Sequence, residues 1–342
     1  MNKKHRNYGI DLIKIIACLL VVTLHCLAPT DPVVKNSIFN TSLYYAGTLA
    51  IPIFFMASSY FVLNKRAISY KYSFIRIKNI LFVVISWLLL FSIVKFIFKR
   101  QFNFIDQLKG SAFTRIPNTN FYHFWFFWSL MIMLLIAPLL WELIQHYFKA
   151  YLLLTIIMTV ICLLIDLLIH FGYSKLVQNT PQVFRLNTWI EYYLLGGLVG
   201  NQHFKKILNY IEQRFALFVT LDIILYFILI IYSLWNRNII HWVYAEANYN
   251  NILVLIISVL SLCLFSVSSP IGQNTIEFII STTMGIYIIH PFLIGKVSKI
   301  GFFYCYPSLM IIVIFLICLI GVEIALRIPI INKLFKLKNV LR

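Results

Sequence analysis

Charged residues are scarce in this sequence. They make up 12% of its 342 residues, whereas hydrophobic residues make up 61% and the mean hydropathy is +0.87. In a soluble protein about a quarter of the residues are charged. This composition therefore excludes an ordinary soluble domain and indicates a polytopic membrane protein. Long polar segments are absent as well. The longest gap between hydrophobic runs, from Lys99 to His123, leaves no room for a separate soluble domain.

Acidic residues are the rarer of the charged ones, since 11 Asp and Glu stand against 29 Lys and Arg and give a net charge of +18. The basic residues cluster at the ends of hydrophobic runs, where they fix topology and face anionic lipids. They form no nucleic-acid-binding motif. The six cysteines show no C-x-x-C spacing and lie mostly inside hydrophobic runs, so we expect them to be packing residues. We predict no metal and no nucleic-acid partner.

The hydrophobic runs predict an all-α integral membrane protein in a single domain, residues 1–342, with about ten transmembrane helices. The runs are 10–28, 43–63, 79–98, 124–146, 150–171, 188–202, 215–234, 251–268, 276–294 and 306–327, of which 188–202 is short. Lys and Arg are more numerous at the run ends that share a side with the N-terminus. Both termini are therefore predicted to be cytoplasmic.

The first hydrophobic run, Gly9 to Ala28, contains the ionisable residues Asp11, Lys14 and His25. Charged side chains inside membrane helices are costly and usually functional. At a helical rise of about 1.5 Å per residue, Lys14 and His25 lie roughly 16 Å apart, near opposite sides of a hydrocarbon core about 30 Å thick. Asp11 and Lys14 can pair at i and i+3. Charges interrupt the run and no A-x-A site follows it, so we expect no cleavable signal.

Two interpretations of this run are open. It is either a signal-anchor with a snorkelling basic end, or an active helix with one end that holds an anion and one that handles a proton. Three histidines, His25, His123 and His290, fall on the predicted outer side, whereas the basic loop 65–78 and Glu323 fall on the cytoplasmic side. This distribution favours the active helix and suggests a path between two compartments.

Four motifs follow one another along the chain: IDLIKIIACLLVVTLH (10–25), IPIFFMASSYFVL (51–63), FYHFWFFWSLMIMLLIAPLL (121–140) and GIYIIHPFLI (285–294), with YYLLGGLVG (192–200) as a weaker fifth. In series they resemble acyltransferase family 3 of the membrane O-acyltransferases. They are particularly similar to the bacterial branch that includes the O-acetyltransferase of enterobacterial common antigen. Two positions depart from the family pattern: Lys14 stands where many members have Arg, and Ser59 stands where glycine is usual.

The resemblance implies transfer of an acyl group, usually acetyl from cytoplasmic acetyl-CoA, to a hydroxyl of an envelope glycan or lipid-linked saccharide. The expected location is a bacterial plasma membrane, with lipids as neighbours. It implies catalytic roles for Lys14 and His25. An imidazole with a pKa near 6.5 can take the proton of the attacking hydroxyl or accept the acyl group itself. Lys14 would hold an anion, either a CoA phosphate or the developing oxyanion, or orient the helix through Asp11.

Arg76, in the basic loop, is the candidate for the phosphates of CoA, although such loops also serve only to fix topology. His123 and Trp125 open an aromatic run that can stack on a sugar ring or form an interfacial belt. His290 with Tyr287 is expected to bind the acceptor or to support His25, and the alternative is that His290 is simply a packed, hydrogen-bonded histidine.

Glu323 is a lone acid in the last hydrophobic run, so we expect it to pair with a buried cation such as Lys14 or Arg76. The chief rival function is a transporter or flippase for an anionic or glycan substrate. A structural subunit of a glycan-export assembly, and transfer of another acyl group such as succinyl, also stay open. The sequence does not indicate an oligomeric state.

Overall fold

The computed structural model describes residues 6–113 and 119–335, and within these ranges every regular element is helical, which confirms the predicted fold class. The longer helices are α1 (Tyr8–Cys26), α4 (Ala50–Val62), α5 (Tyr70–Lys99), α7 (Trp125–His146), α8 (Phe148–Leu168), α10 (Leu186–Val199), α12 (Phe215–Ile239), α13 (Ile252–Val267), α14 (Gln273–Val297) and α16 (Pro307–Arg327). The shorter ones are α2 (Pro32–Lys35), α3 (Ile38–Ala46), α6 (Phe104–Phe113), α9 (Ser174–Asn179), α11 (Lys205–Gln213) and α15 (Gly301–Cys305). Short helical turns include η1 (Gly47–Leu49), η2 (Tyr122–Phe124), η4 (Gln182–Phe184) and η6 (Ala245–Asn248).

Each predicted hydrophobic run overlaps one of these helices, and 8 helical stretches of the described chain are long and apolar enough to cross a membrane. They are Tyr8–Cys26, Ile38–Val62, Tyr70–Lys99, Tyr122–His146, Phe148–Asn179, Phe215–Ile239, Gln273–Val297 and Pro307–Arg327. α10 has 14 residues, which span about 21 Å, less than a hydrocarbon core of about 30 Å. α13 is also shorter than the eight. The total of about ten spans therefore stays a prediction.

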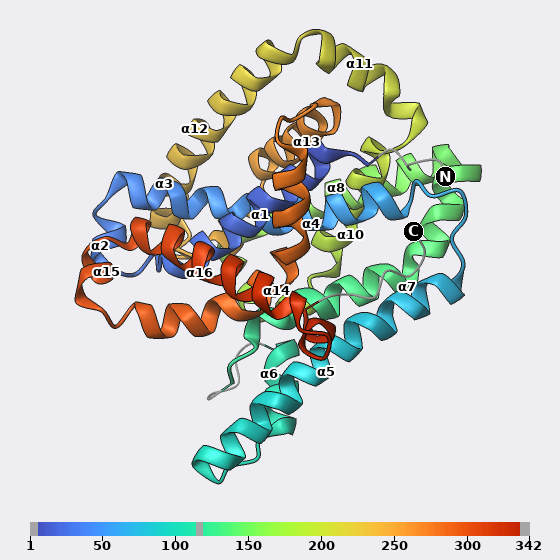
Figure 1. The fold of residues 1–342 in the computed structure, drawn as a ribbon. Coiled ribbons are helices and arrows are strands. Elements are labelled where there is room, and N and C mark those ends of the chain that lie inside the picture. The colour runs from blue at the N-terminus through green and yellow to red at the C-terminus, as the bar shows by residue number, and fades with distance from the viewer. Residues whose placement is uncertain (1–5, 114–118, 336–342) are drawn as a thin grey trace.

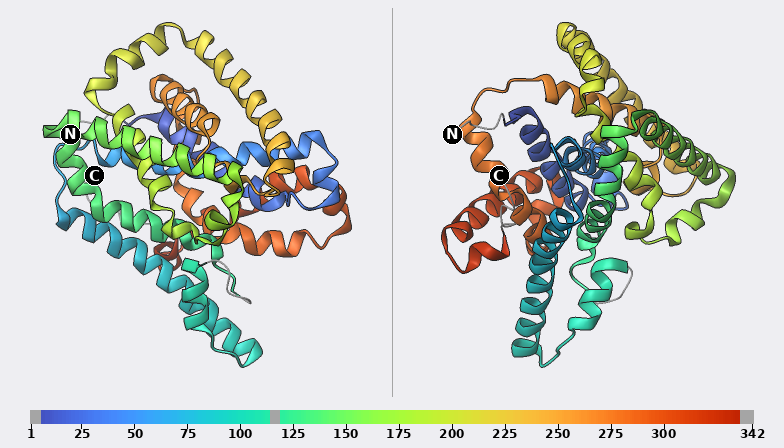
Figure 2. Two further views of the ribbon diagram at one scale, coloured as in Figure 1. Left: turned by 180° about the vertical axis from the view of Figure 1, so that it is seen from behind. Right: turned by 90° about the vertical axis from the view of Figure 1, so that its right-hand side faces the viewer.

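α1 lies in the middle of the bundle, where it packs against α4, α13, α14 and α16 (Figures 1 and 2). α4 packs against α10, and α5 packs against α7. α11 and α12 form an arch at the top of Figure 1, and α5 and α6 extend at the bottom. α8 and α12 expose many Leu and Ile side chains, as helices that face lipid do.

The start of α1 is fixed by Asn7. Its side-chain oxygen accepts a hydrogen bond from the backbone N–H of Ile10 at 3.0 Å, the N-cap that Asn side chains favour. Its side-chain amide donates to the carbonyl oxygen of Ser266 at 2.8 Å, which ties this end of α1 to the end of α13. The cap and the tether hold α1 in place, and with it the side chains of Lys14 and His25.

The crossing of α4 and α10 explains the serine at a position where glycine is usual. Ser59 is buried and its hydroxyl donates to the carbonyl oxygen of Met56 at 3.0 Å. The close approach is provided by Gly196 of α10, where an added Cβ would lie 2.2 Å from the carbonyl oxygen of Met56 and 2.3 Å from the Ser59 hydroxyl. The partner helix thus carries the glycine that makes room for Ser59.

The ends of the helices gather in two sets, as alternating membrane crossings require. Asn64 after α4 donates to the carbonyl oxygen of Gly197 in α10 at 3.0 Å, and Tyr8 of α1 donates to Glu277 of α14 at 2.7 Å. At the opposite end, Tyr192 of α10 donates to the carbonyl oxygen of Tyr249 before α13 at 2.7 Å. The first set contains the ends predicted to be cytoplasmic, and we call it the inner end and the other the outer end.

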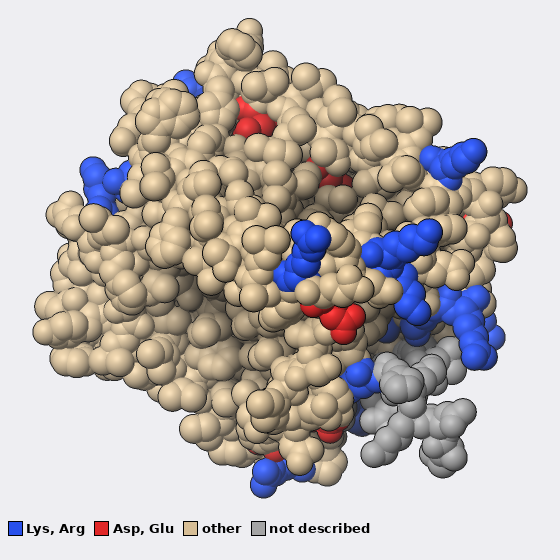
Figure 3. Space-filling model, turned by 90° about the horizontal axis from the view of Figure 1, so that it is seen from above, with Lys and Arg blue, Asp and Glu red and all other residues tan. Residues whose placement is uncertain are grey.

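Charge is sparse on the molecular surface. Most of the face in Figure 3 is uncharged, and Lys and Arg lie mainly toward one edge. Some of the basic residues behind the topology prediction, namely Lys3, Lys4, Arg115, Lys336, Lys338 and Arg342, lie outside the described residues, as do both chain termini. The cytoplasmic placement of the termini therefore stays a prediction.

Candidate functional site

Three histidines from distant parts of the sequence meet at the outer end. The ring of His25 in α1 lies 5.1 Å, centroid to centroid, from the ring of His290 in α14. His290 in turn lies 5.7 Å from His123 in η2. The sequence predicted a shared depth for these residues, and the structure adds their lateral proximity.

The hydrogen bonds of the three rings differ. His25 Nδ1 lies 3.0 Å from the hydroxyl of Tyr122. His123 Nε2 lies 3.2 Å from the carbonyl oxygen of Ile288, and His290 Nδ1 lies 3.0 Å from that of Ile286. Within the described chain, His123 Nδ1 and His290 Nε2 have no hydrogen-bond partner although both are buried. His25 is the partly exposed member of the cluster, since His123 and His290 are almost fully buried.

His25 faces a cavity of about 370 Å³ at the outer end, which we call the outer chamber. α1, the segment after it, α3, α4, η2, α7, η4, the segment around η6 and α14 all contribute to its walls. The lining side chains that bear on function are His25, Tyr122, His123, Trp125, Gln182, Tyr244, Glu246, Tyr249 and Tyr287. The described residues that line it include one carboxylate, Glu246, and no Lys or Arg. His290 supports this wall from behind and does not line the chamber.

Lys14 faces a second cavity of about 320 Å³ toward the inner end, which we call the inner chamber. Lys65 and Arg76 line it as well, and its described lining contains no Asp or Glu. Tyr72 holds two of these cations: its hydroxyl accepts from Arg76 Nη1 at 3.2 Å, and the Lys65 ammonium lies 4.5 Å from its ring centroid. Lys14, Lys65 and Arg76 form no salt bridge with any acid of the described residues. The chamber is therefore ready to bind an anion.

Tyr287 lines both chambers and forms the partition between them. Its hydroxyl donates to the carbonyl oxygen of His123. Its ring packs against those of Phe126 and Phe127, with centroids 5.6 and 5.3 Å away. One helix, α1, thus presents Lys14 to one chamber and His25 to the other, with a buried aromatic residue of α14 between them.

Two predicted pairings are wrong. The carboxylate of Asp11 pairs with Arg6 at 2.5 Å rather than with Lys14, because Arg6, just before the N-cap, reaches the first turn of α1. Arg6 also contacts Glu277 at 3.1 Å. Glu323 pairs with Arg327 one turn later in α16, at 3.1 Å, rather than with Lys14 or Arg76. Neither Asp11 nor Glu323 lines either chamber.

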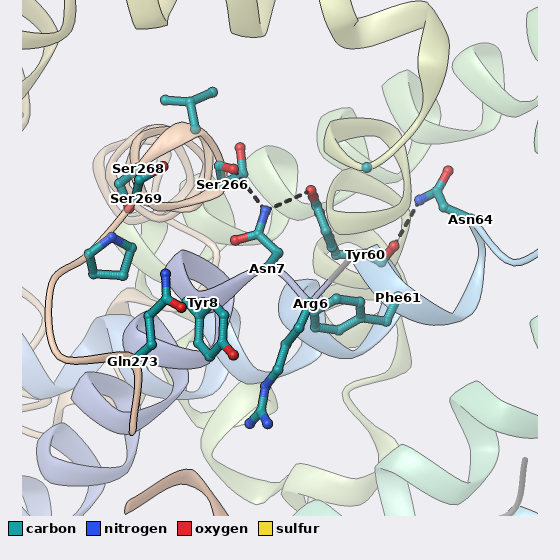
Figure 4. A pocket seen from close by; sticks show the side chains of 13 residues that line it. Arg6, Asn7, Tyr8, Tyr60, Phe61, Asn64, Ser266, Ser268, Ser269 and Gln273 are labelled. Carbon is teal, nitrogen blue, oxygen red and sulfur yellow. Dashed lines mark hydrogen bonds between the residues drawn. The ribbon is translucent and has the colours of Figure 1, made fainter. Parts of the chain in front are cut away.

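A third cavity, of about 620 Å³, opens at the inner end beside the start of α1 (Figure 4). It shares Phe61 with the inner chamber. Figure 4 shows Asn7 directed at Tyr60 and Ser266, whereas the guanidinium of Arg6 is directed away from them. Because that guanidinium is neutralised by two acids, this cavity is polar and without a free cation at Arg6.

Sequence reasoning missed the residues of the segment before α13. Tyr244, Glu246 and Tyr249 line the outer chamber, as does Gln182. A signal was present in the sequence HWVYAEANYNN (241–251). This predicted outer loop between the runs 215–234 and 251–268 is rich in aromatic, acidic and amide side chains. Among the described residues, no group of three or more His, Cys, Asp and Glu side chains is arranged to hold a metal ion.

Comparison with known proteins identifies the family. The family model of an acyltransferase domain matches residues 7–327. An amino-acid racemase of Enterococcus faecalis is 29% identical over 148 residues, which are 40% of this chain and 20% of the racemase. A probable poly-beta-1,6-N-acetyl-D-glucosamine export protein of Staphylococcus aureus is 28% identical over 111 residues, which are 32% of this chain and 30% of that protein.

The similarity thus spans less than a third of the length of these curated relatives, and no solved structure matches the chain. The family match is of a different kind, because it covers nearly the whole chain and includes all four of the motifs. Its helices are those of a multi-pass membrane protein. This chain belongs to the family of membrane acyltransferases with this acyltransferase domain, acyltransferase family 3, as its motifs predict.

Proposed function

We propose that this protein is an O-acyltransferase that moves an acetyl group from acetyl-CoA in the inner chamber to a saccharide hydroxyl in the outer chamber. The observation that carries the proposal is the placement of Lys14 and His25 on one helix, each lining a different chamber, with Tyr287 common to both. Such an arrangement suits a reaction whose two substrates arrive from opposite sides of a membrane. The proposed setting is the plasma membrane of a bacterium, with residues 1–342 acting as one domain.

In this proposal the inner chamber binds the donor. Lys14, Lys65 and Arg76 supply the positive charge that phosphate groups require, and Arg76 offers a planar donor face to a phosphate. CoA is too large to fit within one chamber of about 320 Å³. Its nucleotide end therefore extends toward the neighbouring polar cavity, which the inner chamber meets at Phe61.

His25 is the proposed catalytic base. With its proton on Nδ1, where it donates to the Tyr122 hydroxyl, His25 has a free lone pair on Nε2 for the acceptor hydroxyl. The hydroxyl oxygen forms a bond to the acetyl carbonyl carbon as the thioester C–S bond breaks. The hydroxyl proton passes to Nε2 and from there to the departing CoA thiolate. A route in which His25 first carries the acetyl group uses the same lone pair and stays an alternative.

The other predicted site residues take supporting roles in this proposal. Trp125 offers a ring surface to the acceptor, and His123 and His290 hold the wall behind His25. Tyr287 separates the donor from the acceptor until both are bound. Asp11 acts at a distance by fixing Arg6 and so the start of α1. Glu323 has no part in the reaction.

A saccharide acceptor is supported by the chemistry of the outer chamber and by the relatives. One relative is named for the export of a polymer of N-acetyl-D-glucosamine. That name also supports the rival function, export of a glycan, because two chambers that open toward opposite ends suit a transporter as well. Export of a glycan requires no acyl donor. Binding and use of acetyl-CoA therefore distinguish the acyltransferase from the exporter.

The deciding experiment uses purified protein in lipid nanodiscs with radiolabelled acetyl-CoA and an envelope-glycan fraction. We expect label on the glycan with the wild-type protein and none with His25→Ala, while acetyl-CoA binding persists in that variant. The control is His203→Ala, which removes a histidine that lies outside both chambers and stacks on Phe148. Absence of both acetyl-CoA binding and CoA release in the wild-type protein would overturn the proposal in favour of export.

A further inference from the structure

The outer chamber has a polar wall that the reaction chemistry does not explain. The side-chain amide of Gln182, in η4, donates a hydrogen bond to Oε2 of Glu246, in η6. The guanidinium of Arg185 lies 3.7 Å from the same oxygen and is itself buried. Gln182 and Glu246 line the chamber directly, whereas Arg185 stands behind them.

This wall contains hydrogen-bond acceptors that the described residues leave unpaired. Oε1 of Gln182 is buried and has no hydrogen-bond partner among the described residues. The side chain of Glu246 is 31% exposed, and its bonds to the protein are made through Oε2. An unpaired buried acceptor costs free energy unless a donor reaches it. A ligand with hydroxyl or N–H groups would supply those donors.

The charge of the wall limits the ligand further. Arg185 balances the carboxylate of Glu246 from behind, and the described lining of the chamber offers no Lys or Arg to an anionic group. A carboxylate or phosphate on the ligand would face Glu246 without a compensating cation. The wall therefore disfavours an anionic ligand.

Aromatic side chains complete the site. Trp125, Tyr244 and Tyr249 line the same chamber, and such rings cover the apolar face of a sugar while their polar atoms stay hydrogen-bonded. Trp125 is held in place by stacking on Trp189, with ring centroids 5.1 Å apart. Burial raises the pKa of the Tyr249 phenol, so this hydroxyl stays neutral.

The segment that carries Glu246 is rigidly anchored. The Tyr44 hydroxyl accepts a hydrogen bond from the backbone N–H of Ala245 at 2.9 Å. The side-chain amide of Asn248 donates to the Ser233 hydroxyl at 3.0 Å. A connection fixed on both sides of Glu246 positions the carboxylate before any ligand arrives, which lowers the entropic cost of binding.

We propose that Gln182, Glu246 and the aromatic wall form a specificity site for a non-anionic saccharide unit, whose hydroxyl or amide N–H groups donate to Gln182 Oε1 and Glu246. The inference rests on the proposed function, since it names the class of acceptor for that reaction. Gln182 and Glu246 select the acceptor, and the reacting hydroxyl is left to His25.

The test compares two sugars that differ only at C6, methyl β-N-acetylglucosaminide, with a hydroxymethyl group, and methyl β-N-acetylglucosaminuronide, with a carboxylate. Binding to the protein in nanodiscs, without donor, is followed by saturation-transfer NMR. We expect the neutral glycoside to bind and the uronide to bind at least about tenfold more weakly, the range of one lost hydrogen bond to a charged group. Binding of neither sugar, or equal binding of both, would overturn the inference.

Variants locate the site. Gln182→Leu and Glu246→Gln are expected to weaken binding of the neutral glycoside about tenfold and to leave the affinity for acetyl-CoA unchanged. Glu142→Gln is the matched control, because Glu142 is an exposed acid of α7 near the inner end. If both variants bind the sugar as the wild-type protein does, the inference fails. Sugar binding that needs Gln182 but is followed by no acetyl transfer would instead leave the site in place and overturn the proposed function.

Discussion

The inner and outer chambers are close in size, at about 320 and 370 Å³, and share α1 and Tyr287, yet their chemistry is opposite. The inner chamber has three cations and no acid in its described lining. The outer chamber has one acid, no cation and a cluster of histidine and aromatic side chains. Two compartments of equal polarity would suit one substrate that passes through. Compartments of unlike polarity support the proposal of two different ligands that meet at the partition.

The largest effect should come from the histidine that faces the outer chamber. His25→Ala is expected to lower acetyl transfer at least about 100-fold, the usual contribution of a general base. Donor affinity should change little, because His25 does not line the inner chamber. Transfer kinetics and equilibrium binding of acetyl-CoA measure the two quantities. A parallel loss of donor binding would remove the distinction between the chambers.

Removal of charge from the inner chamber should have the next largest effect. Lys14→Ala and Arg76→Ala are each expected to raise the KM for acetyl-CoA by about tenfold or more, because each loses a charge-assisted hydrogen bond. Glycoside binding in the outer chamber should be unaffected. Lys78→Ala is the control, since Lys78 lies on the same helix, α5, and is exposed outside the chamber. A KM shift of the same size in Lys78→Ala would point to surface charge alone.

The separation of the two chambers can be tested by substitution of Tyr287. Tyr287→Ala removes the ring that lines both chambers, and we expect a severalfold rise in CoA release without acceptor, since water then reaches the thioester. Tyr287→Phe keeps the ring, loses the hydrogen bond to His123 and should show a smaller rise. CoA release is measured with a thiol reagent in the absence of glycan. Unchanged release in Tyr287→Ala would mean that the two chambers are not separated by this residue.

The smallest effect concerns α4, which like α1 contributes side chains to both chambers. α4 provides Ile51 to the outer chamber and Ser58 to the inner one, and its position depends on Gly196. Gly196→Ala is expected to cost about 1–3 kcal/mol of stability through overpacking, visible as a lower Tm. Gly321→Ala, where an added Cβ meets no atom within 4 Å, should not lower the Tm. Equal behaviour of the two variants would show that the crossing tolerates a side chain.

The helices and the depth of the ionisable residues were predictable from the sequence, because hydrophobic runs and helical rise act along the chain. The salt-bridge partners of the acidic residues were not predictable in this way. Asp11 was assigned to Lys14 by its helical spacing, but it pairs with Arg6 from the segment before α1, which no helical periodicity places. Glu323 was assigned a partner by depth, but Arg327 lies one turn away on the same helix and satisfies it locally. Short-range partners compete well because ordering them costs little entropy.

The contact between Gln182 and Glu246 in the outer chamber could not be predicted from the sequence, for a different reason. Gln182 and Glu246 come from two connections that are far apart in the sequence, and neither connection has a periodic pattern that places it on a helix face. Their contact depends on how α10, α12 and α13 pack together. Likewise, the sequence alone could not show how Ser59 is accommodated where glycine is usual, because the room for its side chain comes from Gly196 on another helix.

The central claim is that donor and acceptor enter from opposite ends and react at the boundary of the two chambers. The most direct measurement uses sealed proteoliposomes with radiolabelled acetyl-CoA outside and methyl β-N-acetylglucosaminide trapped inside. The account predicts labelled glycoside in the lumen, its absence with His25→Ala, and no product when both substrates are outside only. Product formed when both substrates share one side, and none when they are separated by the membrane, would contradict it.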